Sequence, residues 1–348
     1  MKIKKVNHWW YRNAYYIFGI AILFTLFFSN FQDTDSKRWH FTGSTMGTFY
    51  TVTYHGDIAS NNLKPVFENY LSSIEDQLSN WDEESWISQF NYSDETSLVF
   101  IPDHAFHVLN YALELTDYTN GGFDPTLGEL IMLWGFGPQE GQRPPNDEAI
   151  HAALKATGVE KLTLKDSPPQ VAKSHPGLHL NLSAVTKGYA VDLLAQHLES
   201  EGIENYVINI GGDMRTSGRP VNQSVWTISI QKPDPDTKGD QAYEKIHLNS
   251  AGIATSGDYH RYIKIDGSHY SHILDPETGW PVQSNLASVT IIAPTAVQAD
   301  GIATACMALG VETAIELVES IEQVEGLFIS RKSEGEFETI KSSKWPYF

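Results

Sequence analysis

Two oxygen-bearing side chains, Asp300 and Thr304, lie four residues apart in a segment with helical periodicity. Residues at this spacing project from one face of a helix, so a carboxylate and a hydroxyl would point the same way. These hard donors suit Mg²⁺, Ca²⁺ or Mn²⁺, whereas the thirteen histidines form neither an HExxH motif nor a Cys/His cluster suited to zinc. On its own the pair is more simply explained as a helix-capping aspartate and a threonine bonded to the preceding turn.

A second stretch with chemical potential is residues 181–192, Asn-Leu-Ser-Ala-Val-Thr-Lys-Gly-Tyr-Ala-Val-Asp. A short strand, 178–182, is expected to run into it, and a helix is expected to leave it. The first amides of a helix lack internal partners and carry a partial positive charge. Ser183 and Ala184 therefore mark a place for a phosphate, within reach of Lys187. The alternative is an ordinary strand-to-helix turn capped by Ser183.

Glycines and other small residues recur where strands are expected to end. They stand at 46–48, 121–122, 183–184, 211–213 and 256–258. A ligand that carries phosphates and is held mainly by backbone groups would use such turns. The chain lacks GxGxxG after a first strand and lacks GxxxxGK[ST], so neither a Rossmann dinucleotide fold nor a P-loop nucleotide-binding fold is expected.

The composition of the 348-residue chain limits its class of function. The formal net charge of −19 disfavours non-specific nucleic-acid binding, which requires a basic surface. Cys306 is the only cysteine, so no internal disulfide can form. Its apolar surroundings indicate that it packs in the core.

The N-terminus has a pattern of its own. An apolar run over residues 14–28 follows four basic residues, Lys2, Lys4, Lys5 and Arg12. Basic residues followed by about 15 apolar ones are typical of a secretory signal or a signal anchor, and no convincing cleavage site or lipobox cysteine follows. We therefore expect residues 1–40 to be an uncleaved membrane anchor and tether, with residues 41–348 outside as one catalytic domain.

Helical and strand-like segments are mixed along the body of the chain. Helices are expected at 63–78, 86–90, 103–119, 126–133, 147–157, 183–198, 296–309 and 311–319. Residues 41–54 are expected to form a strand pair, or one long strand interrupted at 46–48. Further strands are expected as a hairpin of 161–164 and 170–172, as single strands at 178–182, 206–210, 225–230, 286–292 and 326–330, and as antiparallel strands within 246–270 broken at 254–259. The sequence predicts an α+β fold of mixed, largely antiparallel sheets with packed helices.

Seven motifs in order carry a resemblance to a known family. They occupy residues 46–48, 122–126, 181–192, 209–213, 254–259, 272–279 and 299–304. In this order and spacing they resemble the ApbE family of flavin transferases, from about residue 41 to about residue 329. Each motif is weak alone, and the ordered set makes the resemblance specific.

The resemblance implies a fold and a chemistry. Members of the family are FAD:protein FMN transferases, which take FAD and Mg²⁺, move the FMN half onto a threonine hydroxyl of a partner protein and release AMP. Their acceptors are typically subunits of membrane redox complexes that carry covalent FMN on the outer face. We therefore expect an ApbE-like catalytic domain in the periplasm, attached to the inner membrane of a bacterial cell.

The resemblance also implies site residues. The metal ligands would be Asp300, Thr304 and the backbone carbonyl of Ala184. The FAD contacts would be Met46, Ser79, Asn80, Trp81, Gly122, Phe123, Asp124, Asn181, Lys187 and Ile273. Asn181 departs from the family, which usually has aspartate there. Asparagine keeps an acceptor oxygen but drops a charge, which would lower the affinity for Mg²⁺ if this residue also tunes the metal.

Transfer of the FMN half needs charge neutralisation and a base. A metal and a lysine would neutralise the FAD pyrophosphate and stabilise the AMP leaving group. The attacking threonine must lose a proton, and His272, which matches a histidine thought to assist catalysis in the family, and Asp258 are the candidate bases. Either residue could instead only hold a turn.

Two other functions stay open at this point. One is an FAD pyrophosphatase with the same site and metal, in which water attacks and free FMN and AMP result. The other is a flavin-binding envelope protein without turnover. Asp300 and Thr304 argue against the second, because binding alone would not need a metal at the pyrophosphate.

Overall fold

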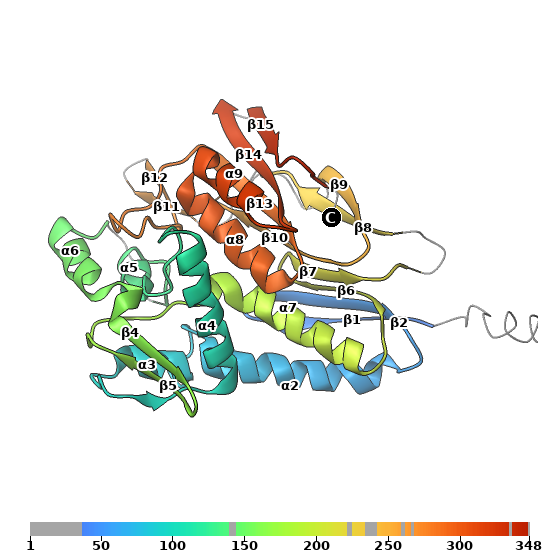
Figure 1. Ribbon diagram of the computed structural model, residues 1–348, viewed down its shortest axis with the longest axis horizontal. Coiled ribbons are helices and arrows are strands. Elements are labelled where there is room, and N and C mark those ends of the chain that lie inside the picture. The colour runs from blue at the N-terminus through green and yellow to red at the C-terminus, as the bar shows by residue number, and fades with distance from the viewer. Residues whose placement is uncertain are drawn as a thin grey trace, which may run out of the picture. The chain divides into compact units, whose positions relative to one another are not determined.

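An eight-stranded antiparallel sheet lies at the centre of the fold (Figure 1). The computed structural model describes residues 37–138, 144–220, 225–233, 242–258, 262–265, 268–333 and 336–346. The strand order is β1 (Arg38–Thr45), β2 (Thr48–His55), β6 (Asn205–Ile210), β7 (Asp213–Ser217), β10 (Ala251–Gly257), β13 (Leu286–Ala293), β14 (Glu325–Ser333) and β15 (Glu336–Lys341). Every pair of neighbours is antiparallel. The prediction of an α+β fold with largely antiparallel sheets is confirmed.

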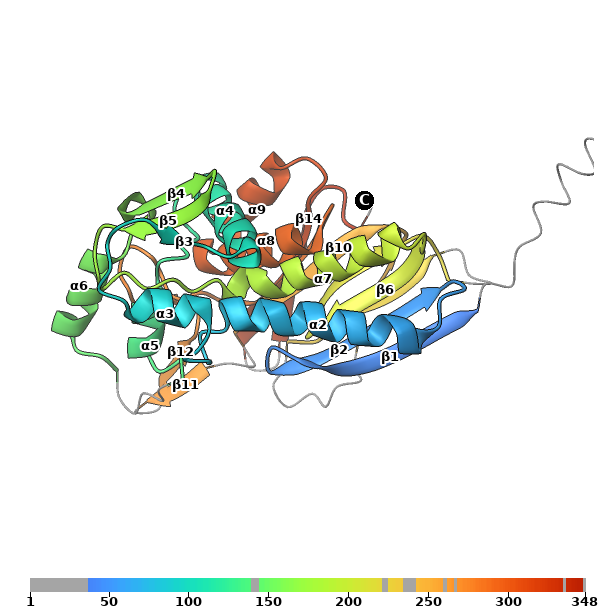
Figure 2. The same cartoon turned by 90° about the horizontal axis from the view of Figure 1, so that it is seen from below.

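Helices cover one face of this sheet and a strand pair covers the other. The helices are α2 (Ser60–Leu78), α4 (Asp103–Tyr118), α7 (Ser183–Ser200), α8 (Ala296–Leu309) and α9 (Val311–Ser320). Figure 2 shows α2 and α7 side by side along the strands. The pair β8 (Trp226–Gln231) and β9 (Ala242–Leu248) packs Ile228 and Ile246 with Ile292 of β13. Its neighbour Ile291 belongs to the helix-side core, as the alternation of side chains along a strand requires.

Smaller elements extend the fold beside the helices. They are a three-stranded sheet of β3 (Val99–Phe100), β5 (Pro169–Lys173) and β4 (Leu162–Asp166), the hairpin β11 (Tyr262–Ile265) and β12 (Ser268–Ser271), the helices α3 (Trp86–Tyr92), α5 (Gly128–Leu133) and α6 (Asp147–Ala156), and the short 3-10 turn η1 (Val159–Lys161). A separate core of Leu130, Trp134, Ile150 and Leu274 joins α5, α6 and the 272–279 turn. Trp134 also donates its indole N–H to the carbonyl of Gly279 at 2.8 Å.

The expected membrane anchor and most of its tether lie outside the described residues, which begin at Lys37. Within the described ranges, no helix combines the length and apolarity needed to cross a membrane. The residues from Arg38 onward form one compact unit. The division of the chain into residues 1–40 and 41–348 therefore stays a prediction.

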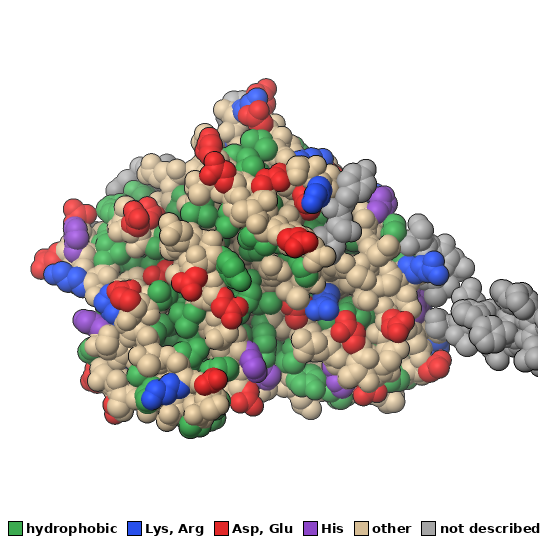
Figure 3. Space-filling view, in the orientation of Figure 1, with side chains coloured by type: hydrophobic (Ala, Val, Ile, Leu, Met, Phe, Trp, Pro, Cys, Tyr) green, Lys and Arg blue, Asp and Glu red, His purple; other side chains and the backbone are tan. Residues whose placement is uncertain are grey.

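Acidic side chains are scattered over the face shown in Figure 3, with basic side chains between them. This distribution matches the net charge of −19, which is spread along the sequence. On this face the charge acts mainly as a general solubilising surface.

The segment before α7 is not the strand that the sequence predicts. Only His179 forms an isolated bridge, with Leu127. Asn91 accepts a hydrogen bond from the N–H of Leu180 at 2.7 Å and donates to its carbonyl at 2.9 Å. The buried Lys173 ammonium donates to the carbonyl of Leu178 at 3.2 Å. Because the side chains of Asn91 and Lys173 satisfy these backbone groups, the segment needs no neighbouring strand.

Other boundaries differ from the predictions for local reasons. Helix α5 begins at Gly128 and not at residue 126, because Asp124 accepts hydrogen bonds from the N–H and the hydroxyl of Thr126, at 2.7 and 2.5 Å, and holds a turn there. The expected break at 254–259 comes later, since β10 stays paired with β13 through Gly257; residue 259 lies outside the described part. The sequence did not predict three strands, β3, β7 and β15.

Candidate active site

Segments far apart in the sequence meet around one cavity of about 650 Å³. Fourteen of the fifteen predicted site residues line it: Met46, Ser79, Asn80, Trp81, Gly122, Phe123, Asp124, Asn181, Ala184, Lys187, His272, Ile273, Asp300 and Thr304. The fold therefore brings together the predicted metal ligands, a lysine, a histidine and an aromatic wall. These are the groups that a reaction at a phosphate would need.

Asp258 is the predicted site residue that does not line this cavity. Its carboxylate accepts hydrogen bonds from both terminal nitrogens of Arg331, at 2.8 and 2.5 Å. A bidentate ion pair of this kind holds a carboxylate in one orientation. This pairing does not favour Asp258 as the base. The local sequence could not show it, because Arg331 comes from β14.

Helix α7 begins at the cavity without a serine cap. Its N-cap residue is Leu182, which makes no side-chain capping bond. Asn181 Oδ1 instead accepts from the N–H of Ser183 at 3.1 Å and from its hydroxyl at 2.6 Å. The oxygen that asparagine keeps at this position thus shapes the turn. Ser183, Ala184 and Lys187 line the cavity, so the positive end of the helix lies there.

A buried cluster of three charged side chains lies beside the start of α7. Lys187 Nζ forms an ion pair with Asp213 and lies 3.6 Å from Asp300 Oδ1. Burial, and then the neighbouring Asp213, raise the pKa of Asp300 to about 8. Although burial lowers it, the two carboxylates raise the pKa of Lys187 overall. When fully ionised, the cluster carries one excess negative charge, which favours a bound cation.

The oxygen donors around this cluster suit a hard cation. Asp300 and Thr304 both reach the cavity from α8, and Thr304 Oγ1 lies 3.0 Å from Ser256 Oγ. No group of three or more His, Cys, Asp and Glu side chains in the described ranges is placed to hold a metal. Two carboxylates, hydroxyls and a backbone carbonyl nevertheless fit Mg²⁺, which commonly keeps water or substrate phosphate as its other ligands.

Aromatic and aliphatic side chains form another part of the wall. The aliphatic members include Ile74, Leu78, Leu127, Ile131, Met132, Ile273 and Leu274. Among the aromatic ones, Phe123 is buried and Trp81 is 62% exposed. The ring of Phe136 stands edge-on to the ring of His272, with centroids 6.2 Å apart. An apolar wall beside a charged cluster suits a ligand with a flat ring system and a phosphate chain.

Two of the predicted contact residues also hold the backbone of the wall. Asn80 Nδ2 donates to the carbonyl of Leu180 at 3.0 Å, close to the start of α7. Asp124 holds Thr126, whose hydroxyl in turn accepts from the N–H of Gly158 at 2.7 Å. Burial raises the pKa of Asp124, against the hydrogen bonds from Thr126. These side chains therefore have structural partners whether or not they touch a ligand.

The wall also contains polar residues that were not predicted individually as site residues, among them Glu75, Asp213 and Ser256. Asp213 carried a local indication in the sequence, because it directly follows two glycines in a turn where a ligand could approach closely. Ser256 stood in a run of small residues, and its hydroxyl pairs with Thr304 across 48 positions of the chain. Glu75 carried none, because it lies inside a helix of ordinary periodicity.

Comparisons with known proteins agree with the fold described above. The model of the ApbE family matches residues 46–328. The chain belongs to the ApbE family, as its motifs predict.

Individual relatives cover nearly the whole chain. The chain is 37% identical to the FAD:protein FMN transferase of Vibrio cholerae serotype O1 over 318 residues, which are 90% of this chain and 93% of the relative. It is 36% identical to the FAD:protein FMN transferase of Escherichia coli K12 over 315 residues, 88% of each chain.

Solved structures show the same fold. The flavin transferase ApbE from Vibrio cholerae aligns with a TM-score of 0.79 at 35% identity, covering 88% of this chain and 98% of that one. The apo form of the flavinyl transferase ApbE from Pseudomonas stutzeri aligns with a TM-score of 0.80 at 35% identity, covering 88% and 95%.

Proposed function

We propose that this chain is an FAD:protein FMN transferase that, with Mg²⁺, moves the FMN half of FAD onto a threonine hydroxyl of an acceptor protein and releases AMP. The observation that carries the proposal is one cavity that joins an aromatic wall to the Lys187, Asp213 and Asp300 cluster in a member of the ApbE family. Relatives that bear the name FAD:protein FMN transferase support it.

The two parts of the cavity would bind different parts of FAD. The isoalloxazine ring fits the apolar wall that contains Trp81, Phe123 and Ile273. The pyrophosphate fits the start of α7, where the helix dipole and Lys187 both favour negative charge. This orientation places the bond to be broken beside the carboxylate cluster.

Asp300, Thr304 and the carbonyl of Ala184 would hold Mg²⁺, with Asp213 next to them. When bound, Mg²⁺ supplies a Lewis acid that withdraws charge from the phosphoryl oxygens. Lys187 neutralises part of the same charge from the protein side. Asp300 is oriented for this task by the N–H of Gly188, which donates to its Oδ2 at 3.0 Å.

The remaining step is a displacement at phosphorus. The threonine oxygen of the acceptor forms a bond to the FMN phosphorus while the bond from that phosphorus to the bridging oxygen breaks. AMP leaves with the electron pair of the broken bond. The threonine proton passes to a ring nitrogen of His272, which lies on the cavity wall. A positioned base of this type contributes about 10²–10⁴-fold to such a step.

The experiment that tests this function is incubation of the purified protein with FAD, Mg²⁺ and a candidate acceptor. Intact mass spectrometry of the acceptor should show a gain equal to one FMN residue, located on a threonine, and chelation of Mg²⁺ should abolish it. Free FMN and AMP with an unmodified acceptor would instead identify an FAD pyrophosphatase. Bound flavin without any AMP would identify a protein that only binds flavin.

We further propose that residues 1–40 anchor the protein in the inner membrane of a bacterial cell, with the catalytic domain in the periplasm and with membrane redox-complex subunits as acceptors. The basic residues followed by an apolar run support the anchor. Cell fractionation should find the protein in the membrane fraction with Met1 to Phe28 retained. A soluble protein that begins near Asn30 would contradict the anchor.

A further inference from the structure

The turn between β1 and β2 has a backbone conformation that its sequence does not favour. Thr45 pairs with Thr48, so Met46 and Gly47 form a two-residue hairpin loop. Both have positive φ, 48° at Met46 and 70° at Gly47. Such turns favour asparagine, aspartate or glycine at the first position. A bulky methionine there is strained and requires an external partner to hold it.

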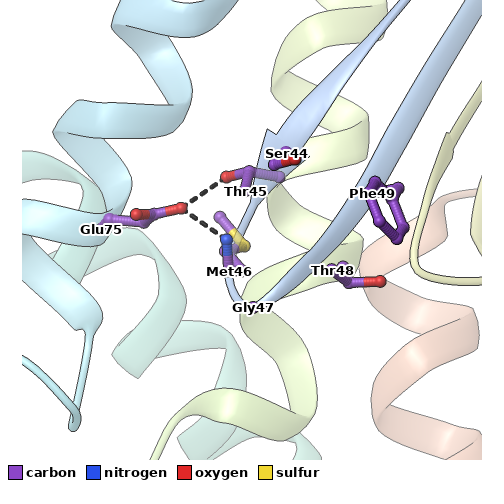
Figure 4. A pocket seen from close by; sticks show the side chains of 7 residues that line it. All are labelled: Ser44, Thr45, Met46, Gly47, Thr48, Phe49 and Glu75. Atoms are coloured by element: carbon purple, nitrogen blue, oxygen red, sulfur yellow. Dashed lines mark hydrogen bonds between the residues drawn. The ribbon is translucent and has the colours of Figure 1, made fainter.

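The partner is Glu75, near the end of α2. Its Oε1 accepts a hydrogen bond from the N–H of Met46 at 2.5 Å and another from the hydroxyl of Thr45 at 2.6 Å. Figure 4 shows the carboxylate reaching the turn from the helix beside it. The N–H of the first loop residue has no partner in the hairpin ladder. A bond to a carboxylate is the strongest hydrogen bond a side chain can offer it.

The turn that Glu75 holds is part of the cavity wall. Met46, Gly47 and Glu75 line the cavity together with Lys187 and Asp300. The same three residues also line a shallow groove of about 420 Å³ at the tip of the hairpin. A displaced turn would therefore change the shape of the cavity itself.

The turn also abuts the segment that carries Asp213. The N–H of Gly211 donates to the carbonyl of Phe49 at 3.0 Å. A Cβ at Gly211 would lie 2.8 Å from Thr48 Cγ2, so the two turns pack without free space. Residue Asp213 follows Gly211 by two positions. The β1–β2 turn therefore packs against the segment that leads into Asp213.

We propose that Glu75 is a positioning residue for the FAD substrate: its carboxylate fixes the Met46–Gly47 turn in the conformation that completes the FAD-binding wall. This inference rests on the proposed function, because it takes FAD as the ligand of the cavity. Glu75 acts through the backbone of Met46 and takes no part in the bond changes at phosphorus.

The test uses three variants of the full chain. Glu75→Ala removes both hydrogen bonds, and Glu75→Gln keeps an acceptor oxygen for them. Asp76→Ala removes a charge from the next, exposed position of the same helix. Flavin fluorescence gives the Kd of FAD, transfer kinetics give kcat and KM, and thermal melting gives Tm.

Loss of two charge-assisted hydrogen bonds from a ligand wall should raise the FAD Kd and KM of Glu75→Ala about tenfold, with kcat within about threefold of the unmodified protein. Glu75→Gln should restore most of the affinity, and Asp76→Ala should match the unmodified protein. A Glu75→Ala protein with unchanged Kd, or one with a lowered Tm but unchanged Kd, would overturn the inference.

A second variant covers the case in which Glu75→Ala does not fold. Thr45→Val removes only the hydroxyl donor and should raise the Kd of FAD about threefold; an unchanged Kd there would also overturn the inference. The proposed function fails separately. An unmodified protein that binds FAD but transfers no FMN contradicts the function alone, and one that binds no FAD contradicts both.

Discussion

The backbone N–H of Gly188 donates to Asp300 Oδ2 at 3.0 Å and ties the start of α7 to α8. A Cβ at Gly188 would lie 2.5 Å from the carbonyl oxygen of Ala296 and 2.6 Å from the Cα of Val297. Only glycine allows the two helix backbones to approach this closely. The orientation of the buried Asp300 carboxylate thus depends on a glycine at position 188.

Replacing this glycine should separate the helices. We expect Gly188→Ala to lower the free energy of unfolding by about 1–3 kcal/mol, as overpacking against backbone does, and to weaken Mg²⁺ binding because Asp300 loses its orientation. Urea denaturation and a Mg²⁺ titration monitored by Tm measure the two effects. Equal unfolding free energy and equal Mg²⁺ response in the variant would refute the role of this contact.

Removing the carboxylate itself should separate stability from activity. Asp300→Ala should reduce FMN transfer about a hundredfold or more, since it removes a proposed ligand of the Mg²⁺ that would stabilise the transition state. The metal-free variant should still fold, because Lys187 remains paired with Asp213. Circular dichroism and transfer assays at several Mg²⁺ concentrations test this. Full Mg²⁺-dependent activity in the variant would rule out the proposed metal site.

The two candidate bases should behave differently when they are replaced. His272→Ala should lower kcat about 10²–10⁴-fold with little change in the Kd of FAD, because it removes the proton acceptor. Asp258→Asn should keep kcat within about threefold, because this carboxylate is occupied by Arg331. Single-turnover transfer assays distinguish them. A large loss of kcat in Asp258→Asn and almost none in His272→Ala would identify Asp258, and not His272, as the base.

The buried lysine that supports the segment before α7 gives a pH dependence. Burial lowers the pKa of Lys173 to about 8, from 10.5. Between these values the unfolded chain holds more protons than the folded one, so this group adds stability as the pH rises. The difference in unfolding free energy between the unmodified protein and Lys173→Met should grow from pH 8 to about 10.5 and stay flat below. A difference independent of pH would contradict the lowered pKa.

Local patterns predicted the elements that carry the chemistry. The spacing of Asp300 and Thr304 placed both on one face of a helix, and both reach the cavity from α8. The Met46–Gly47 break in an otherwise strand-like stretch indicated a strand pair or one interrupted strand, and the structure has the pair, β1 and β2. Periodicity and small-residue turns are properties of neighbouring residues, so the sequence displays them directly.

What the sequence could not show depends on partners far along the chain. Residues 178–182 look like a strand, and they are not one because Asn91, 89 positions away, satisfies the N–H and the carbonyl of Leu180. Asp258 looks like a free acid in a turn until Arg331 is seen beside it. Local sequence patterns do not predict contacts across 70 or more positions, since these contacts form only when the chain folds.

Transfer to a protein differs from hydrolysis in that AMP release depends on an acceptor, so AMP release should be compared with and without one. A transferase must keep water from the FMN phosphorus, because hydrolysis would waste FAD. We therefore predict slow AMP release from FAD and Mg²⁺ alone, and fast release matched one to one by FMN on an acceptor threonine when the acceptor is supplied. Equal AMP release in both cases, with the acceptor unmodified, would show that the protein is a hydrolase and not a transferase.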